Sequence, residues 1–522
     1  MSDDDVSRRR FLRRAGWTTA AVVAPAAAGY VGYSWPRTDA EPATAGTNQP
    51  SGTDQTPDVH HFVSRPDLTP PRLSVADGRG GDELASLPRS PGYLTLAPKG
   101  YPDDGPGQRG CMLANRMGQP VWFLPREGEN EVPMDFKVQT YRGEPVLTWW
   151  QGTVHEGYGT GKGVIYDSSY RKVAEVNTGD DVEDADLHEF LLTDDGTALL
   201  MAYQPHAVDL SELGGPTRGW AFSGVVQEVD VETGKVVSHW DSIDHVDLTE
   251  AYTELADTGS RKTPFDYFHI NAIDLDDDGD LLMSARNTWA IYKISRRTGE
   301  VIWRLGGKKS DFTLGANAEF YWQHDARWLS KRRMSLFDNA AAPPQAERSR
   351  GLILDLDTQA MRADVVQEYV HPTNLLADNQ GNMQVLSDRR VIIGWGAQPY
   401  ASEYTSDGEL LRDWRFPAAD QTYRAYSFDW TGTPDDAPAV GVTTNPARGF
   451  LVYASWNGAT DVRRWRILAG ANADDLTPVA TMPRSGFETA VAVNADGPFF
   501  AAVALDKNGR VLGTSDTVRS EQ

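Results

Sequence analysis

The chain has 522 residues and a formal net charge of −24. A surface this acidic repels phosphate groups, which argues against nucleic acids and anionic membranes as partners. The 48 glycines and 31 prolines favour turns over long helices, and 40% hydrophobic residues can fill a large core. Because Cys111 is the only cysteine, no disulfide can form within the chain.

The amino terminus resembles a twin-arginine (Tat) export signal. Arg8, Arg9 and Arg10 precede an apolar stretch and a small-residue region at 26–28. We therefore expect a signal over residues 1–35, recognised by the Tat translocase, and an extracellular, periplasmic or cell-surface protein. An uncleaved membrane anchor over residues 15–33 is the alternative. Residues 36–70 have no apolar periodicity and are predicted to be a disordered linker.

The central part of the chain repeats a unit of four short strands. Apolar runs alternate with turns rich in Gly, Asp and Asn, and no sustained helical period occurs. Five complete units span residues 136–176, 187–240, 268–305, 323–369 and 382–414. Repeats of this kind predict an all-β fold, a β-propeller over residues 71–432.

A sixth unit is split between the two ends of this region. One strand is expected at 423–428, and the others at 92–96, 110–113 and 120–123. Pairing them would close the ring and remove an exposed sheet edge, so we predict six blades. Residues 433–522 contain about seven further short strands and resemble a fibronectin type III or immunoglobulin-like sandwich.

Three histidines recur in the same phase of successive units. His188, His269 and His324 each stand where a first strand begins, and the first strands of a propeller line one central channel. Arg286 ends the strand that forms a hairpin with the one after His269, so it should lie near His269 and Asn271. Residues far apart in the sequence would thus form one site.

Two chemistries suit this cluster. A neutral imidazole could attack sulfur or phosphorus while Arg286 and the other histidines stabilise the charge on the transferred group. Alternatively the histidines could bind a metal, with His371 as a fourth ligand. Arg286 favours the first chemistry, because a guanidinium stabilises an oxyanion and is repelled by a dication.

Motifs around these histidines resemble those of the bacterial arylsulfate sulfotransferases, in their Tat-exported branch. The resemblance is specific over residues 186–340 and extends more weakly over about 60–515. Its motifs are, in one-letter code, LHE at 187–189, HIN at 269–271, SARN at 284–287, TGEVIWRLGGK at 298–308 and QHDAR at 323–327.

The resemblance implies a propeller enzyme that moves a sulfuryl group from a phenolic sulfate ester to a phenol through a sulfohistidine, with no nucleotide donor, metal or other cofactor. His324 corresponds to the nucleophile. His188, His269 and Arg286 correspond to catalytic groups that bind the sulfate oxygens, and Asn271 to a substrate-binding residue. The short spacing between His269 and His324 leaves an exchange of their roles open.

Other features favour structural roles. The acidic run at 274–280 resembles a calcium loop but has Ala285 at its twelfth position, so a hairpin turn is favoured. Lys308 and Lys309 could face an anion, although a surface turn is favoured. Packing is the favoured role of the aromatic residues that might stack an acceptor, which are Trp149, Trp150, Tyr321 and Trp322. A noncatalytic cell-surface propeller that binds polymers or partners remains the rival function.

Overall fold

The computed structural model describes residues 58–78, 92–100, 105–417, 420–445, 449–520. The predicted export signal, and the alternative anchor over 15–33, lie outside these ranges. In the described part, the helices are three short 3-10 turns, Ser211–Leu213, Ser242–Asp244 and Leu248–Glu250. No described helix has the length and hydropathy to cross a membrane.

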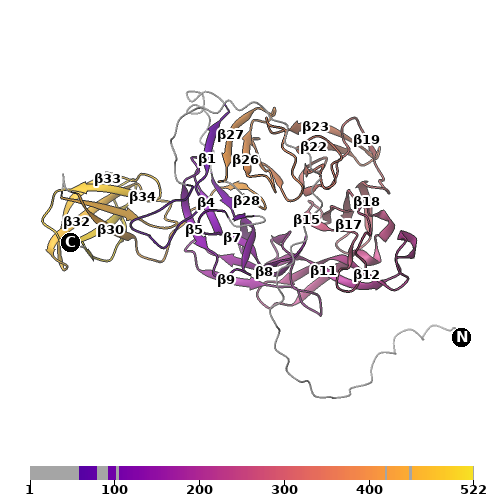
Figure 1. Cartoon of the computed structure of the whole chain (residues 1–522), viewed down its shortest axis with the longest axis horizontal. Coiled ribbons are helices and arrows are strands. Elements are labelled where there is room, and N and C mark those ends of the chain that lie inside the picture. Colours follow the sequence, from indigo (N-terminus) through magenta and orange to yellow (C-terminus); the bar gives the residue numbers. More distant parts are fainter. Residues whose placement is uncertain (1–57, 79–91, 101–104, 418–419, 446–448, 521–522) are drawn as a thin grey trace, which may run out of the picture. The chain divides into compact units, whose positions relative to one another are not determined.

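Four antiparallel strands in sequence order form each of five sheets (Figure 1). The first contains β6 (Val132–Tyr141), β7 (Glu144–Val154), β8 (Gly159–Tyr166) and β9 (Lys172–Val176). The second contains β10 (Phe190–Leu192), β11 (Thr197–Val208), β12 (Gly219–Asp230) and β13 (Val236–Asp241). The two-residue β14 (Phe265–Asp266) adds to β12 in parallel.

The next three sheets follow the same order. They contain β15 (Ile270–Leu275), β16 (Leu281–Ala285), β17 (Ala290–Ile294) and β18 (Val301–Gly306); β20 (His324–Ser330), β21 (Arg333–Asp338), β22 (Arg350–Asp357) and β23 (Arg362–Tyr369); and β24 (Asn382–Val385), β25 (Val391–Gly394), β26 (Tyr400–Tyr404) and β27 (Leu410–Arg415). A short strand extends two of them: β19 (Thr313–Leu314) pairs with β23, and β1 (Ser74–Asp77) pairs with β27.

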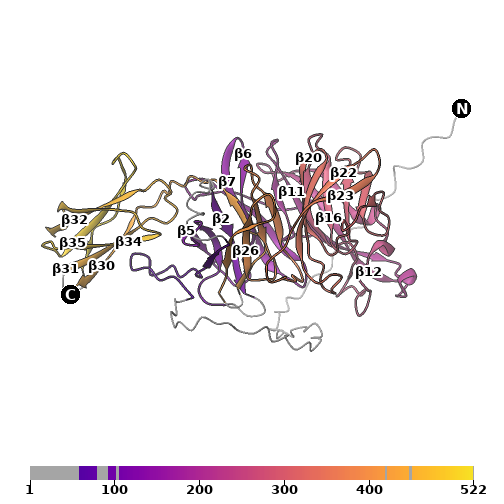
Figure 2. The same ribbon diagram turned by 90° about the horizontal axis from the view of Figure 1, so that it is seen from above.

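Strands from both ends of the region form one further sheet. β29 (Tyr426–Phe428) pairs with β2 (Tyr93–Leu96), which continues to β4 (Gly110–Ala114) and β5 (Pro120–Pro125). Beside it, β3 (Pro98–Gly100) pairs with β28 (Asp420–Thr422). The predicted pairing of the two ends is confirmed, as is the all-β propeller class. We interpret the six sheets as the six predicted blades, which Figure 2 shows from the side.

Alternating residues pack the blades against one another. In β11, Leu199 and Met201 contribute to the core shared with the sheet of β15, while Ala198 and Leu200 contribute to the core shared with the sheet of β6. This division follows from the two-residue period of a strand, whose successive side chains point to opposite faces. β11 is therefore held on both faces. The same is true of β10, the first strand of this blade, because Phe190 and Leu192 pack in the core shared with the sheet of β6 and Leu191 packs against the core shared with the sheet of β15.

The linker prediction is wrong for residues 58–70. Leu68 is 2% exposed and belongs to the apolar core of the closing sheet and β27. The Ser64 amide donates to Glu488 Oε2 at 2.6 Å. Composition suggested disorder, but a few buried apolar residues and the hydrogen bonds from the amide and hydroxyl of Ser64 to Glu488 attach this segment.

The C-terminal region forms two sheets around its own core. β30 (Ala439–Asn445), β31 (Gly449–Ser455) and β34 (Glu488–Val493) make one sheet, and β33 (Asp475–Pro483), β32 (Arg464–Asn472), β35 (Phe499–Leu505) and β36 (Val511–Thr514) the other, with β37 (Val518–Arg519) paired to β35. Trp456 and Trp465 are buried in this core. The order resembles a fibronectin type III sandwich, which remains our interpretation.

Candidate functional site

The three phased histidines lie together. The ring of His188 is 5.1 Å from that of His269 and 6.4 Å from that of His324, measured between centroids. His188 and His269 precede β10 and β15, and His324 begins β20. All three side chains are at least nine-tenths buried. Residues up to 136 positions apart in the sequence therefore form one cluster, as the phase of the repeat predicted.

Arg286 joins this cluster through the hairpin of β15 and β16. Its backbone amide donates to His269 O at 2.8 Å, which confirms the predicted proximity. The guanidinium lies over the Trp322 ring, 4.7 Å from its centroid, and Nη1 donates to Asn287 Oδ1 at 3.0 Å. Stacking and this hydrogen bond fix the plane of the fork. Burial lowers the pKa of Arg286 to about 10, so it stays charged at neutral pH.

His188 and His269 each form a hydrogen bond from Nδ1 to a carboxylate. The partner of His188 is Asp186, whose other oxygen accepts the Gly159 amide at 2.7 Å. The partner of His269 is Asp266. Burial lowers the pKa of His269, and Asp266 opposes that shift by stabilising the imidazolium. Both imidazoles therefore carry a proton on Nδ1 and turn Nε2 away from the carboxylate.

His324 has a neutral partner instead. The Asn339 amide nitrogen donates to Ala377 O at 3.1 Å and to Gln380 O at 2.9 Å, so its oxygen faces His324 Nδ1, at 2.7 Å. Nδ1 must therefore be the donor, which leaves the Nε2 lone pair free. Burial, with Arg286 and His188 nearby, lowers the pKa of His324 well below its usual value. This imidazole is neutral at pH 7, and sequence motifs gave no indication of Asn339.

Strained backbone surrounds these side chains. His269, Trp289, Trp322 and Asp325 all have φ between 50° and 56°, the left-handed region that residues with a Cβ rarely adopt. Each such residue costs on the order of 1 kcal/mol and persists only where packing fixes it. Such strain is often found at functional sites. Here it sets the direction of the His269 side chain and of the segment that enters β20.

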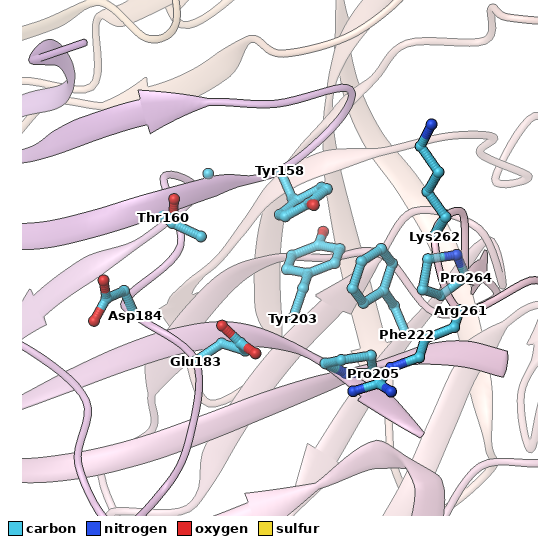
Figure 3. Close-up of a pocket in the computed structure, with 11 residues that line it drawn as sticks. Tyr158, Thr160, Glu183, Asp184, Tyr203, Pro205, Phe222, Arg261, Lys262 and Pro264 are labelled. Carbon is cyan, nitrogen blue, oxygen red and sulfur yellow. The ribbon is translucent and has the colours of Figure 1, made fainter. Parts of the chain in front are cut away.

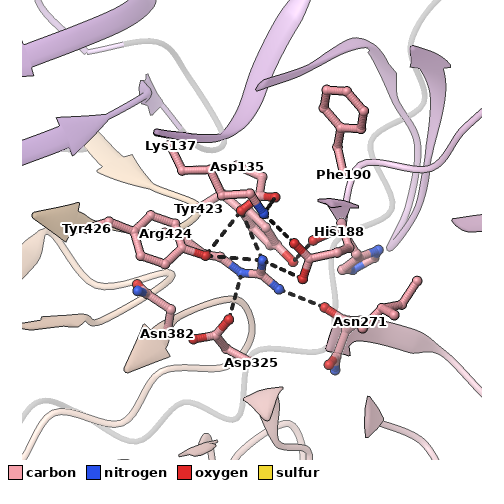
Figure 4. A network of polar contacts seen from close by, with 12 residues as sticks. Asp135, Lys137, His188, Phe190, Asn271, Asp325, Asn382, Tyr423, Arg424 and Tyr426 are labelled. Carbon is pink, nitrogen blue, oxygen red and sulfur yellow. Dashed lines mark hydrogen bonds and ion pairs between the residues drawn. The ribbon is translucent and has the colours of Figure 1, made fainter. Parts of the chain in front are cut away.

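Beside the histidines, charged residues from several blades form a buried network that we call the hub. Figure 4 shows Arg424 at its centre; Nη1 lies 2.9 Å from Asp135 Oδ1 and 3.1 Å from Glu189 Oε2. The other members are Lys137, Asp325 and Arg327. Three cations thus balance three carboxylates. Glu189 and Asp325 directly follow His188 and His324, so alternate residues serve the hub and the histidine cluster.

Asn271 contacts the hub and the approach to His324. Its Nδ2 donates to Gln323 O at 2.7 Å, and its backbone oxygen accepts from Arg424 Nη2 at 2.8 Å. These contacts position the segment before His324. The assignment of Asn271 to substrate binding stays a prediction.

His371 lies apart from the cluster, in contact with Thr373, Asp413 and the rings of Trp395 and Tyr400. Across the described residues, no group of three or more His, Cys, Asp or Glu side chains could hold a metal ion. The acidic run forms a hairpin turn, as favoured from the sequence: Asp276 accepts the amides of Asp278 and Asp280 and pairs with Lys293.

The remaining sequence candidates have structural contacts. Lys308 donates to Thr249 O and Ala251 O, and Lys309 pairs with Glu250. Trp149 and Trp150 are buried in the cores between blades. Trp322 supports Arg286, and the ring of Tyr321 lies edge-on to Trp289.

Residues 137–416, more than half of the chain, match the family model described as Arylsulfotransferase (ASST). No curated protein matches. Similar solved structures include a protein of unknown function from Bacteroides caccae (13% identity, TM-score 0.36, 65% of this chain and 99% of that one). Others are a catalytically inactive virginiamycin B lyase from Staphylococcus aureus with quinupristin (10%, 0.33, 74% and 96%) and the β-propeller domain of Cps50 from Myceliophteria thermophila (13%, 0.32, 64% and 95%).

Proposed function

The chain belongs to the arylsulfotransferase family, and from that premise we propose that it moves a sulfuryl group from a phenolic sulfate ester to a phenol through a sulfohistidine at His324. The observation that carries this proposal is the difference between the partners of the histidines. His324 holds a neutral amide, whereas His188 and His269 hold carboxylates. A neutral imidazole with a free Nε2 is a nucleophile, and one beside a carboxylate readily accepts a proton and donates to an anion.

In the first half-reaction, the His324 Nε2 lone pair attacks sulfur. The N–S bond forms while the S–O bond to the aryl group breaks, and the phenolate leaves with the bonding electrons and takes a proton from water. Asn339 Oδ1 and Trp322 O accept the Nδ1 proton and so stabilise the positive charge that grows on the ring. An acceptor phenolate, whose proton has gone to water, then attacks sulfur and releases His324.

Arg286, His188 and His269 supply the charge that the sulfuryl oxygens need. The Arg286 fork is held in plane by Trp322 and Asn287, so little reorganisation is required when the anion binds. The negative charge of the bound group raises the pKa of His269, whose Nε2–H group then donates to its oxygens, and the His188 ring lies 5.1 Å from the His269 ring on the same site. The ester itself supplies the sulfuryl group and His324 carries it to the acceptor, so the scheme uses neither a nucleotide donor nor a metal.

Trapping of the intermediate tests this proposal. We expect the full chain, mixed with 4-nitrophenyl sulfate and no acceptor, to gain a mass of about 80 daltons, that of one sulfuryl group, on His324. The adduct should vanish in His324→Ala and persist in His371→Ala, a matched change of a buried histidine outside the cluster. An adduct on His269 would exchange the two roles. No adduct and no transfer with any aryl sulfate would favour the noncatalytic binding propeller.

We also propose that the protein is exported through the Tat translocase and works outside the cytoplasm. The support is the Arg8-Arg9 pair ahead of an apolar stretch. In the native host, Arg8→Lys combined with Arg9→Lys should leave the protein inside the cell, whereas Arg13→Lys should not. Secretion of the double variant at the normal level would contradict this route.

A further inference from the structure

A pocket of about 190 Å³ adjoins the histidine cluster, and the proposed reaction leaves it without a role (Figure 3). Tyr203 belongs to both: its ring lines the pocket and lies 5.9 Å from the His188 ring and 5.6 Å from the His269 ring. The turn between β7 and β8 also contacts both the histidine cluster and the pocket. A Cβ on Gly157 would lie 3.3 Å from His269 Cε1, and Tyr158, the next residue, is part of the pocket wall.

The walls of this pocket suit a flat ring. Tyr158 stacks on Tyr203 with centroids 5.6 Å apart, and Phe222 lies 4.9 Å from Tyr158 and 6.1 Å from Tyr203. Pro205 and Pro264 add rigid apolar surface. The three aromatic rings contact one another and form one wall of the cavity, and such a wall recognises another aromatic ring through stacked and edge-to-face contacts.

Charges of both signs stand at the rim. Glu183 and Asp184 lie on the Thr160 side in Figure 3, and Arg261 lies beside Pro205, whereas Lys262 points away from the rings. The Arg261 guanidinium lies over the Trp220 ring, 5.1 Å from its centroid. Asp184 accepts from Asn177 at 2.9 Å. Among the described residues, neither Glu183 nor Arg261 has an ion-pair partner, and both are exposed, so one anionic and one cationic group can meet a ligand.

We propose that this pocket binds the acceptor and selects a phenol that carries both an ammonium and a carboxylate, as tyrosine does. The phenolic oxygen points past the edge of Tyr203 toward the histidines, the ring packs against the wall that Tyr158, Tyr203 and Phe222 form, and the zwitterionic end reaches Glu183 and Arg261. A phenol with one charge meets only one of these two groups favourably. This inference rests on the proposed function for the identity of the reacting group.

Calorimetry with four phenols tests the pocket without requiring turnover. The ligands are tyrosine, tyramine, 3-(4-hydroxyphenyl)propanoate and 4-ethylphenol, and the protein is the full chain. We expect tyrosine to bind about 2- to 5-fold more tightly than either singly charged phenol, the range for an exposed charge pair. Glu183→Gln should remove the tighter binding of tyrosine relative to the propanoate. Arg261→Gln should remove the tighter binding of tyrosine relative to tyramine. Arg297→Gln, an exposed change in the turn between β17 and β18, should alter neither ratio.

Equal affinities for the four phenols, or ratios that do not change in the two rim variants, would overturn the proposal. Tyr158→Ala should weaken all four ligands together and Tyr158→Phe should not, because the ring and not its hydroxyl forms the wall. Transfer assays on the same panel separate this inference from the proposed function. Sulfuryl transfer without discrimination would defeat only the pocket, and selective binding without any transfer would defeat only the reaction.

Discussion

The histidine cluster and the hub begin at neighbouring residues of the same blades, yet their charges are arranged in opposite ways. In the hub every charged group has a partner. Arg424 contacts both Asp135 and Glu189, and Lys137 contacts the same two carboxylates. In the cluster, Asp186 and Asp266 contact His188 and His269, whereas His324 has the neutral Asn339 as its partner and the Arg286 guanidinium donates to a side-chain amide and a backbone carbonyl. A balanced network holds strands together, whereas an unbalanced one is completed by a bound anion.

The largest expected effect comes from breaking the hub. Arg424→Met removes one of three cations and leaves Asp135 and Glu189 buried without full compensation. We expect a loss of about 3–5 kcal/mol in the free energy of unfolding, the range for removing one partner of a buried ion pair. Urea denaturation of the full chain measures it. Arg142→Met, which breaks an exposed pair with Glu232, serves as the control and should change nothing measurable. Equal stability of both variants would show that the hub does not hold the blades.

Removal of Arg286 should affect the reaction and leave folding nearly unchanged. Arg286→Ala takes away the positioned donors for the sulfuryl oxygens, and we expect kcat to fall by about 10²–10³, as when an oxyanion donor is lost. Arg286→Lys should recover only part of this loss, because an ammonium has no planar fork. Kinetics with an aryl sulfate and a phenol, together with urea denaturation, separate the two effects. A loss of stability as large as that of Arg424→Met would end the distinction between cluster and hub.

The pH dependence should reveal the neutral state of His324. Since its pKa in the folded chain is well below the unfolded value, activity should persist through pH 6.5 and fall only in more acidic solution, as Nε2 takes up a proton. The unfolded chain binds that proton first, so the contribution of His324 to stability also decreases as the pH falls below about 6.5.

Asn339→Asp would sharpen this prediction. A carboxylate in place of the amide stabilises the imidazolium, so the acid limb of kcat should move to higher pH, while Asn339→Ala should lose activity at every pH. The profile is measured as kcat from about pH 4 to 9. An unchanged acid limb in Asn339→Asp would exclude His324 as the group that titrates.

The sequence predicted those features that depend on local pattern. The four-strand repeat, the pairing of β29 with β2 and the proximity of Arg286 to His269 all follow from alternation and hairpin geometry. Contacts across the ring carry no local signal. Arg424 meets Glu189 across 235 positions, so this pair could not be assigned from the sequence. Asn339 differs, because it follows β21, the hairpin partner of β20, and the hairpin argument that placed Arg286 near His269 would also have placed Asn339 near His324. β1 was missed because four mostly exposed residues show no apolar alternation.

The smallest expected effect concerns divalent cations. In the turn at 276–280, Lys293 occupies the place of a cation by pairing with Asp276 and Asp280, and the Asp276 carboxylate already accepts two backbone amides. A chelator such as EDTA should therefore change neither the melting temperature nor kcat. Lys293→Met should create a weak calcium response by freeing these carboxylates, whereas Lys331→Met should not, because Lys331 only approaches Asp277 at 3.9 Å in exposed surroundings. If the chelator inactivates the unaltered chain and one added metal restores activity, the alternative hypothesis that the histidine cluster binds a metal would be favoured.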